Sequence, residues 1–172
     1  MQEVITRKTK KTSLSKMKMS YSIMPTDLNT KGTIYGARLL EYADNLAGSV
    51  AIRHSRCPVT TASVDSFDFL KPFKVGQFLF AEAFVSGVGN QSIEICVKFI
   101  GEEDFSGERF LGALAFLTFR VKGLGPYEKV PLIEPENEEE EFIMKGYCHR
   151  RKKVLDKIEK NKELTKKINL NI

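Results

Sequence analysis

Residues 24–48 read MPTDLNTKGTIYGARLLEYADNLAG, a polar loop that passes directly into an apolar segment rich in small residues. From there to about His54 the apolar side chains recur three and four positions apart, which is the spacing of an amphipathic helix. The repeating positions are Leu39, Leu40, Ala43, Ala47, Val50 and Ala51. We therefore predict a helix from Thr33 to about His54, with Thr30 or Thr33 as its N-cap.

One carboxylate, Asp44, lies inside this apolar stretch. The small side chains around it allow a helix to lie close against a sheet, so we expect an enclosed helix. An ionised Asp is costly on a buried face unless partners satisfy it, and perturbed acids in apolar surroundings are common at active sites. Asp44 is therefore the first candidate for a functional residue.

Strand-like segments flank the predicted helix. Residues 92–99 alternate cleanly, with Ile93, Ile95, Val97 and Phe99 on one face. Connections of hairpin length join the later segments, which predicts a largely antiparallel sheet. The expected class is α+β, with the order strand, buried helix and four strands. The strands are expected at residues 17–24, 59–70, 77–88, 92–99 and 110–121.

Composition divides the chain into one domain with two appendages. At 172 residues and 42% hydrophobic content, the chain can bury one core of ordinary size. We predict a basic N-terminal arm at 1–17, the domain at 18–126 and a charged extension at 127–172. The extension is expected to be an exposed helix or tail, with subunit contact and nucleic-acid binding as the alternatives.

The net charge of +5 has a local origin. Residues 1–18 hold six Lys or Arg and one acidic residue, so we expect a mobile or loosely docked arm. No aromatic residue interleaves these charges, and we expect no nucleic-acid partner. Neither a signal peptide nor a membrane span is evident. The three scattered cysteines indicate neither a disulfide framework nor a metal pair, which favours a cytoplasmic protein.

Several spaced motifs together resemble a known family. They are Pro25-x-Asp27-x-Asn29-x-x-Gly32, Gly36 before Leu39-Leu40, Asp44-x-x-Ala47-Gly48, and residues 62–72 (ASVDSFDFLKP) followed by Val75-Gly76. In this order they resemble the hotdog-fold acyl-CoA thioesterases. The nearest subgroup is the bacterial acyl-CoA hydrolases related to the brain-type cytosolic acyl-CoA hydrolase. The resemblance covers about residues 18–122.

The resemblance implies an assembly as well as a fold. It implies an antiparallel sheet wrapped around one long helix, two such subunits joined into a dimer, and often three dimers in a hexamer. Active sites in this family lie at the dimer interface. Asn29 matches the family's loop asparagine and Asp44 its helix carboxylate, so the two would come from opposite chains.

The residues also suit the chemistry of thioester hydrolysis, which needs an activated water or nucleophile and donors for the developing oxyanion. Asp44 can act as the base or, as the less favoured alternative, as a nucleophile. The Asn29 amide can orient the water or the carbonyl. The backbone amides of Gly36 and Ala37, at the helix N-terminus, are the candidate oxyanion donors. No metal or organic cofactor is expected.

At Ala37 the chain departs from the family pattern, because many relatives carry two glycines where this chain has Gly36-Ala37. The Ala37 methyl is expected to narrow the approach of the carbonyl or to shift the donors.

Binding of CoA requires cations for its phosphates, whereas the middle of the chain is not basic. The candidates for CoA binding are Arg53, Lys71, Asn90, Ser92, Arg120 and Lys122, of which Asn90 and Ser92 lie in a loop that often contacts CoA in relatives. An apolar acyl tunnel could be lined by Leu40, Phe67, Phe69 and Phe84, although Phe at such positions is usually plain core.

Two other functions are alternatives to the thioesterase. A non-catalytic acyl-CoA-binding regulator can share this fold, because fold does not dictate function. Such a binder has no need of Asn29 and Asp44 together. A hotdog dehydratase is disfavoured because no core histidine pairs with a carboxylate in the expected helix context, and His54 is assigned no catalytic duty.

Overall fold

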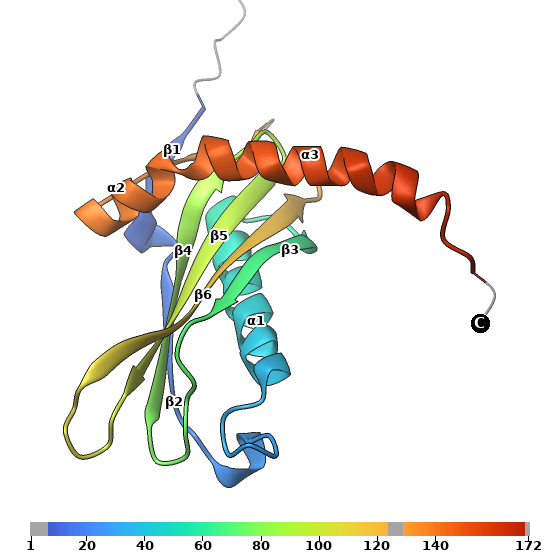
Figure 1. The fold of residues 1–172 in the computed structure, drawn as a ribbon. Helices are drawn as coiled ribbons and strands as arrows, with labels where there is room; N and C mark the ends of the chain where they lie inside the picture. Colours follow the sequence, from blue (N-terminus) through green and yellow to red (C-terminus); the bar gives the residue numbers. More distant parts are fainter. Residues whose placement is uncertain (1–6, 124–128, 171–172) are drawn as a thin grey trace, which may run out of the picture.

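Five antiparallel strands form a sheet that wraps around one long helix in the computed structural model, which describes residues 7–123 and 129–170 (Figure 1). The strand order is β2-β4-β5-β6-β3, with β3 and β2 at the two edges. The elements of this layer are β2 (Met17–Ser22), α1 (Gly36–Ser55), β3 (Val59–Phe69), β4 (Phe78–Val88), β5 (Ser92–Glu102) and β6 (Arg109–Val121). The predicted α+β hotdog architecture is confirmed.

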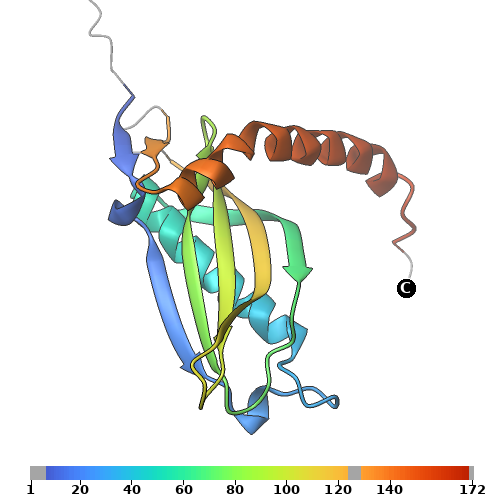
Figure 2. The ribbon, with the colours of Figure 1, turned by 60° about the vertical axis from the view of Figure 1, so that its left-hand side comes forward.

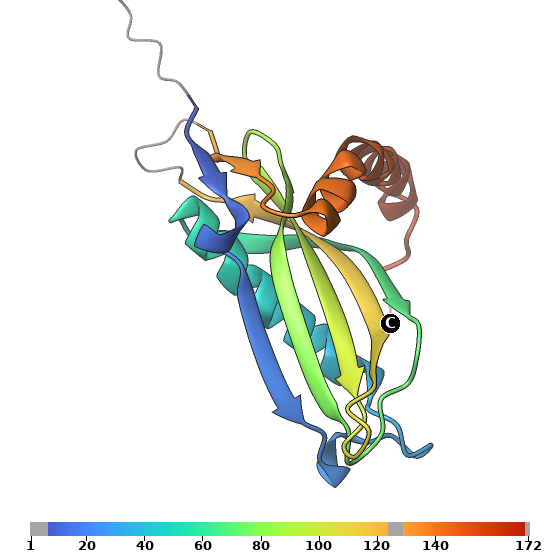
Figure 3. The same ribbon diagram turned by 90° about the vertical axis from the view of Figure 1, so that its left-hand side faces the viewer.

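A second layer comes from the two ends of the chain. It contains β1 (Thr9–Lys11), β7 (Leu132–Glu134), α2 (Glu138–Lys145) and α3 (Tyr147–Thr165). β1 and β7 pair in parallel as a small separate sheet beside the end of α1 (Figure 3). Two short 3-10 turns, Thr12–Leu14 and Pro25–Asp27, complete the described elements.

The helix α1 begins later than its sequence predicted. Tyr35 is the N-cap, with an extended backbone, and neither Thr30 nor Thr33 caps the helix. The chain stays extended up to Tyr35 because the Tyr35 amide donates to the Asp27 carbonyl and the Ile34 amide donates to the Phe73 carbonyl. Backbone pairing with neighbouring segments therefore outweighs the local capping preference.

The sheet has a buried face on each side. Ile93, Ile95, Val97 and Phe99 are fully buried on the face that packs against α1, as predicted. Phe84, Cys96 and Phe116 form a second apolar cluster with Ile143 of α2, on the other face. Phe84 therefore cannot line an acyl tunnel beside α1, and that expectation is wrong.

The N-terminal segment is docked from Arg7 onward, so the expectation of a mobile or loosely held arm is wrong for its described part. Arg7 donates from Nε to the Val130 carbonyl at 2.6 Å and from Nη2 to the Gly89 carbonyl at 2.5 Å. Thr12 is completely buried. β1 also pairs in parallel with β7. Charge composition alone could not reveal these contacts.

The C-terminal helices lie across one end of the sheet and then project beyond it (Figure 2). Glu140 and Val154 are buried, whereas residues 155–170 are exposed. Tyr147, at the start of α3, packs on Gly87 of β4, where a Cβ would lie only 2.1 Å from the Tyr147 ring. The extension is thus part of the folded body up to Val154, and the expectation of a simply exposed helix holds only beyond it.

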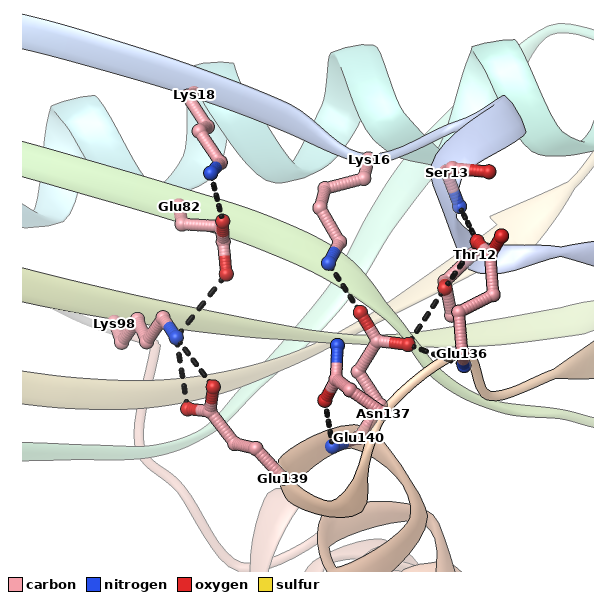
Figure 4. Close-up of polar contacts among 10 residues, drawn as sticks. All are labelled: Thr12, Ser13, Lys16, Lys18, Glu82, Lys98, Glu136, Asn137, Glu139 and Glu140. Atoms are coloured by element: carbon pink, nitrogen blue, oxygen red, sulfur yellow. Dashed lines mark hydrogen bonds and ion pairs between the residues drawn. The ribbon is translucent and has the colours of Figure 1, made fainter.

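An ion network, which we call the terminal network, joins the two ends of the chain to the sheet (Figure 4). Its centre is the buried Glu140, which forms an ion pair with Lys16 and accepts hydrogen bonds from Thr12 Oγ1 at 2.6 Å and the Glu136 amide at 2.8 Å. Lys98 bridges Glu139 and Glu82 next to it. Burial alone would raise the pKa of Glu140, but its hydrogen bonds from Lys16 and Thr12 outweigh this and hold the pKa below 4.5.

We expect Glu140→Gln to lower the free energy of unfolding at neutral pH by about 1–3 kcal/mol, because charge-assisted hydrogen bonds to a buried group are lost. The folded-state pKa is depressed, so this contribution is complete above pH 4.5 and disappears as pH falls through the folded value. Urea unfolding of wild type and variant should therefore converge in acid. Glu138→Gln, on the exposed side of α2, is the matched control. An equal loss in both variants would contradict the role of the network.

Candidate functional site

A cleft of about 370 Å³ opens where the 24–35 loop meets α1. It brings together four candidate site residues from the sequence, namely Asn29, Gly36, Phe69 and Lys71. Its walls are otherwise mainly apolar, and the exposed Phe69 and Leu70 stand at its rim. The remaining lining residues are Thr33, Ile34, Leu39, Pro72 and Phe73. This combination of an apolar cleft with a few polar groups suits a ligand that has an acyl chain.

The loop holds the Asn29 side chain in a fixed orientation. Its Oδ1 accepts from the Lys31 amide at 2.8 Å and the Thr33 amide at 3.4 Å, and its Nδ2 donates to Thr33 Oγ1 at 3.0 Å. The carboxylate of Asp27 is also used locally, since it accepts from the Met24 amide at 2.9 Å. Asp27 therefore stabilises the turn, as expected, and Asn29 is presented at the cleft on a rigid support.

The first turn of α1 supplies backbone donors at the same cleft. No side chain caps this helix end, and the first amides of an α-helix have no intrahelical partner. Gly36 lies against the ring of Phe69, where a Cβ would be 3.3 Å from Phe69 Cζ. Ala37 is exposed and places its methyl beyond the cleft lining. The helix N-terminus is thus uncapped at the cleft, where its partial positive charge favours a negatively charged group.

Asp44 lies in a separate open hollow of about 270 Å³, between α1 and the edge strand β3. Its Oδ1 accepts a hydrogen bond from Thr61 Oγ1 at 2.8 Å. The hollow is also lined by Asn45, Gly48, Ser49, Ile52, Val59 and Phe119. Within one subunit Asp44 is half-buried, because its side of α1 flanks the unpaired edge of the sheet.

Thr61 is the residue that sequence reasoning missed. It follows Asp44 by 17 positions and reaches it because β3 returns along α1. One signal for Thr61 was present in the sequence. A predicted strand follows the predicted helix after a short connection, so the strand returns along the helix and its first residues lie opposite the second half of the helix. A single threonine in a β-branched run, however, resembles an ordinary strand residue.

The two hollows are too far apart to act on one bond within a single subunit. Gly36 and Asp44 are eight positions apart, or about 12 Å along a helix at 1.5 Å per residue. Within one subunit the amides of Gly36 and Ala37 therefore do not reach the Asp44 carboxylate. Asn29 and Gly36 share one cleft, and Asp44 and Thr61 share the other.

A third hollow, which we call the basic hollow, collects cations at the end of the sheet. It measures about 490 Å³ and gathers three predicted CoA-binding residues, Asn90, Ser92 and Arg120. Gln91, Lys129 and Arg151 complete it, and none of the three was predicted. Of the other candidates, Lys71 belongs to the first cleft, with its ammonium 4.1 Å from the centre of the Phe110 ring. Arg53 and Lys122 are exposed and lie outside the lining of the basic hollow.

His54 has a structural position. It is fully buried, and its Nε2 lies 2.9 Å from the Pro131 carbonyl oxygen, which requires the proton to be on Nε2. Burial lowers the pKa of His54, although the hydrogen bond to Pro131 acts in the opposite direction. The neutral imidazole thus connects the end of α1 to the segment before β7, which is a structural role. We assign His54 no catalytic function.

The outer side of the edge strand β3 has no strand paired with it in the described part of the chain. The same strand carries exposed apolar side chains. Val64 and Phe69 are 40% and 59% exposed. Unpaired strand edges with apolar side chains are surfaces for association.

In the described part of the chain, no helix is long and apolar enough to cross a membrane.

An antiparallel sheet wrapped around one long helix is the fold of the hotdog thioesterases. A sequence profile of the thioesterase superfamily matches residues 31–105. An uncharacterized acyl-CoA thioester hydrolase, YkhA of Bacillus subtilis, is 41% identical over 127 residues, which cover 73% of this chain and 74% of that protein.

Solved structures agree with these matches. An aspartate-to-alanine variant of the Staphylococcus aureus acyl-CoA hydrolase superposes with a TM-score of 0.89 and 31% identity, covering 94% of this chain and all of that one. A hexameric acyl-CoA thioesterase superposes with a TM-score of 0.82 and 32% identity over 88% of this chain and 97% of that one. The chain therefore belongs to the thioesterase superfamily, within its acyl-CoA thioester hydrolases, and the family resemblance is confirmed.

Proposed function

We propose that this protein hydrolyses acyl-CoA to a free carboxylic acid and CoA as a homo-oligomer. The observation that carries the proposal is Asp44, a carboxylate oriented by the Thr61 hydroxyl in a hollow open to substrate. The hydrolase of S. aureus has been solved with butyryl-CoA and CoA, and alanine variants of one asparagine, one aspartate and one threonine exist. Those three residues are 15 and 17 positions apart, as are Asn29, Asp44 and Thr61.

The proposed reaction uses water as the nucleophile. Because Thr61 occupies Oδ1 of Asp44, Oδ2 is the oxygen that takes a proton from water. The water oxygen attacks the thioester carbon, and the amides of Gly36 and Ala37 donate to the resulting oxyanion. The carbon–sulfur bond then breaks, and the CoA sulfur leaves and takes the proton from Asp44. General base catalysis of this kind contributes typically about 10²–10⁴-fold.

The separation of the two hollows leads us to assign each active site to two subunits. One subunit contributes Asn29 and the amides of Gly36 and Ala37, and its partner contributes Asp44 and Thr61. A two-fold dimer contains two such sites, because a symmetric interface repeats every contact. Joining across the exposed edge of β3 would bring the flank of one α1 toward the loop of the other.

We also propose a cytoplasmic location. It is supported by the three free cysteines, Cys57, Cys96 and Cys148, of which Cys148 is exposed. Unpaired exposed thiols persist in a reducing compartment.

We expect Thr61→Ala to lower kcat by about 10- to 150-fold, because a hydrogen bond to a charged group is worth roughly 1.5–3 kcal/mol and orients the base. The change leaves the apolar packing intact, since the side chain is exposed. Thr60→Ala, at the neighbouring exposed position of β3, is the matched control. Steady-state rates with one acyl-CoA compare the three proteins, and equal rates for all of them would remove Thr61 from the mechanism.

The function itself is tested by thiol release from acyl-CoAs of increasing length, from acetyl to palmitoyl, with the purified protein. Release of one thiol per acid formed supports the hydrolase and defines its chain-length preference. Tight binding of acyl-CoA without turnover on any member of the series would support the non-catalytic regulator instead.

A further inference from the structure

Two irregular positions interrupt the edge strand β3 close to Thr61. The register of β3 on β6 shifts once between residues 61 and 63 and again between residues 64 and 66. The extra residues are Ala62 and Asp65, which have no Cα partner on β6. Bulges of this kind disrupt the backbone pairing locally, and next to active sites they change the direction in which a side chain points. The direction of the Thr61 side chain therefore depends on how the two bulges are held.

The carboxylate of Asp65 connects these irregular positions to the neighbouring strand. Its Oδ1 accepts a hydrogen bond from Ser63 Oγ at 2.5 Å, and its Oδ2 accepts one from Thr118 Oγ1 of β6 at 2.5 Å. Thr118 is buried, and Ser63 and Asp65 are half-buried. We call these three residues the bulge clamp. It joins the second bulge of β3 both to the residue that follows the first bulge and to β6.

The bulge clamp and the Asp44 hollow use consecutive residues of β6. Thr118 pairs with Ser63, whereas Phe119 pairs with Thr61. Phe119 is buried against α1 and lines the Asp44 hollow. Successive side chains of a strand point to opposite faces of the sheet, so the clamp lies on the face away from α1. An effect of the clamp on Asp44 can therefore pass only through the backbone of β3.

The position of β3 in the sheet makes such a clamp useful. β3 is an edge strand that pairs with β6 alone, and its residues 60–62 are exposed. The Thr61 hydroxyl lies 2.8 Å from Oδ1 of Asp44, and a hydrogen bond weakens steeply when its geometry is lost. A side-chain bond to the adjacent strand restricts the movement of β3 just beyond Thr61, where the backbone ladder is interrupted.

We propose that Asp65 is a positioning residue for the hydrolysis, because it holds β3 in the register that points the Thr61 hydroxyl at Asp44. This inference rests on the proposed function. Asp65 makes no contact with the reacting atoms and acts through Thr61. Its loss should therefore lower the rate only while Thr61 is present.

The test is a double-mutant cycle in kcat between Asp65 and Thr61. Asp65→Ala should lower kcat by about tenfold, the lower limit of the loss expected for Thr61→Ala, and leave KM unchanged. In the Thr61→Ala background the same change should have no further effect. Asp65→Asn should recover most of the activity, because its oxygen accepts one hydrogen bond and its amide donates to the other hydroxyl. Asp68→Ala, at an exposed position of the same strand, is the matched control.

Two further measurements follow the clamp itself. Thr118→Val removes one hydroxyl of the clamp at nearly constant volume and should change kcat in the same direction as Asp65→Ala. In Asp65→Ala the backbone amides of residues 59–64 should exchange with solvent deuterium faster than in wild type, whereas those of β4 and β5 should keep their wild-type rates. Urea unfolding and size-exclusion chromatography check that each variant is folded and keeps its oligomeric state.

The outcomes that overturn the proposal are distinct. Equal fold losses from Asp65→Ala with and without Thr61 would mean that Asp65 acts on the fold as a whole, and a changed oligomeric state would assign it to a subunit contact. Wild-type kcat or unchanged exchange in Asp65→Ala would remove its role altogether. If wild type hydrolyses no acyl-CoA, the proposed function fails, whereas activity that is lost in Thr61→Ala and kept in Asp65→Ala overturns only the role of Asp65.

Discussion

Replacing Asp44 with asparagine is expected to lower kcat by about 10²–10⁴-fold, which is the typical contribution of a general base. The amide has nearly the shape of the carboxylate, and its oxygen can still accept the hydrogen bond from Thr61. What it cannot do is take a proton from water. The KM should change little, because Asp44 acts on the nucleophile and not on the CoA phosphates.

Thiol release under single-turnover conditions measures the chemical step in this variant. The matched control is Asp68→Asn, which removes a carboxylate from an exposed position of the same edge strand that carries Thr61. The control should retain wild-type turnover. Near wild-type turnover by Asp44→Asn would exclude Asp44 as the base and would also exclude it as a nucleophile. A measurable acyl-enzyme on wild type, trapped by rapid quenching, would favour the nucleophile over the base.

Local periodicity predicted the main helices and strands because the side chains that are buried recur at the spacing that the backbone of each element requires. The alternation of Ile93, Ile95, Val97 and Phe99 matches a face that packs on α1, and the 3.6-residue repeat matches α1 itself. The helix start was wrong because the position of Tyr35 is decided by hydrogen bonds to Asp27 and to the 70–77 loop. Such long-range contacts leave no local signature.

The terminal segments show a similar limit. A basic N-terminal stretch and an acidic stretch at 136–141 each resemble solvated tails when taken alone. In the fold they neutralise each other, since Lys16 pairs with the buried Glu140 and Thr12 bonds to the same carboxylate. Complementary charge at the two ends of a chain was visible in the sequence, but nothing in it fixed the register of the pairing.

Family motifs identify single positions in the sequence, and only such positions of the candidate site could be predicted. Asn29 and Asp44 were chosen on such motifs, and the structure places each in a hollow. Thr61, Lys129 and Arg151 were not, because each becomes notable only when a strand, a loop or a second helix brings it beside another residue. The structure also divides Asn29 from Asp44, which makes the assignment of subunits a testable question.

Mixing two inactive variants should restore activity if each site draws on two subunits. Asn29→Ala lacks the amide at one half of the site and Asp44→Ala lacks the base at the other half, so each homodimer is impaired at both of its sites. After subunit exchange, a mixed dimer has one site with both defects. Its second site combines Asp44 from the first variant with Asn29 from the second and is intact.

The recovered activity has a defined ceiling. With equal amounts and random exchange, half of the dimers are mixed and each has one working site of two, so we expect about a quarter of wild-type kcat. Co-expression with two affinity tags isolates the mixed dimer, which should reach about half. A mixture of Asp44→Ala with Thr61→Ala is the control, because both residues belong to the same half-site and every site then keeps a defect. If the isolated mixed dimer is no more active than its parents, then Asn29 and Asp44 serve the same subunit or Asn29 has only its loop role, and the two-subunit assignment is wrong.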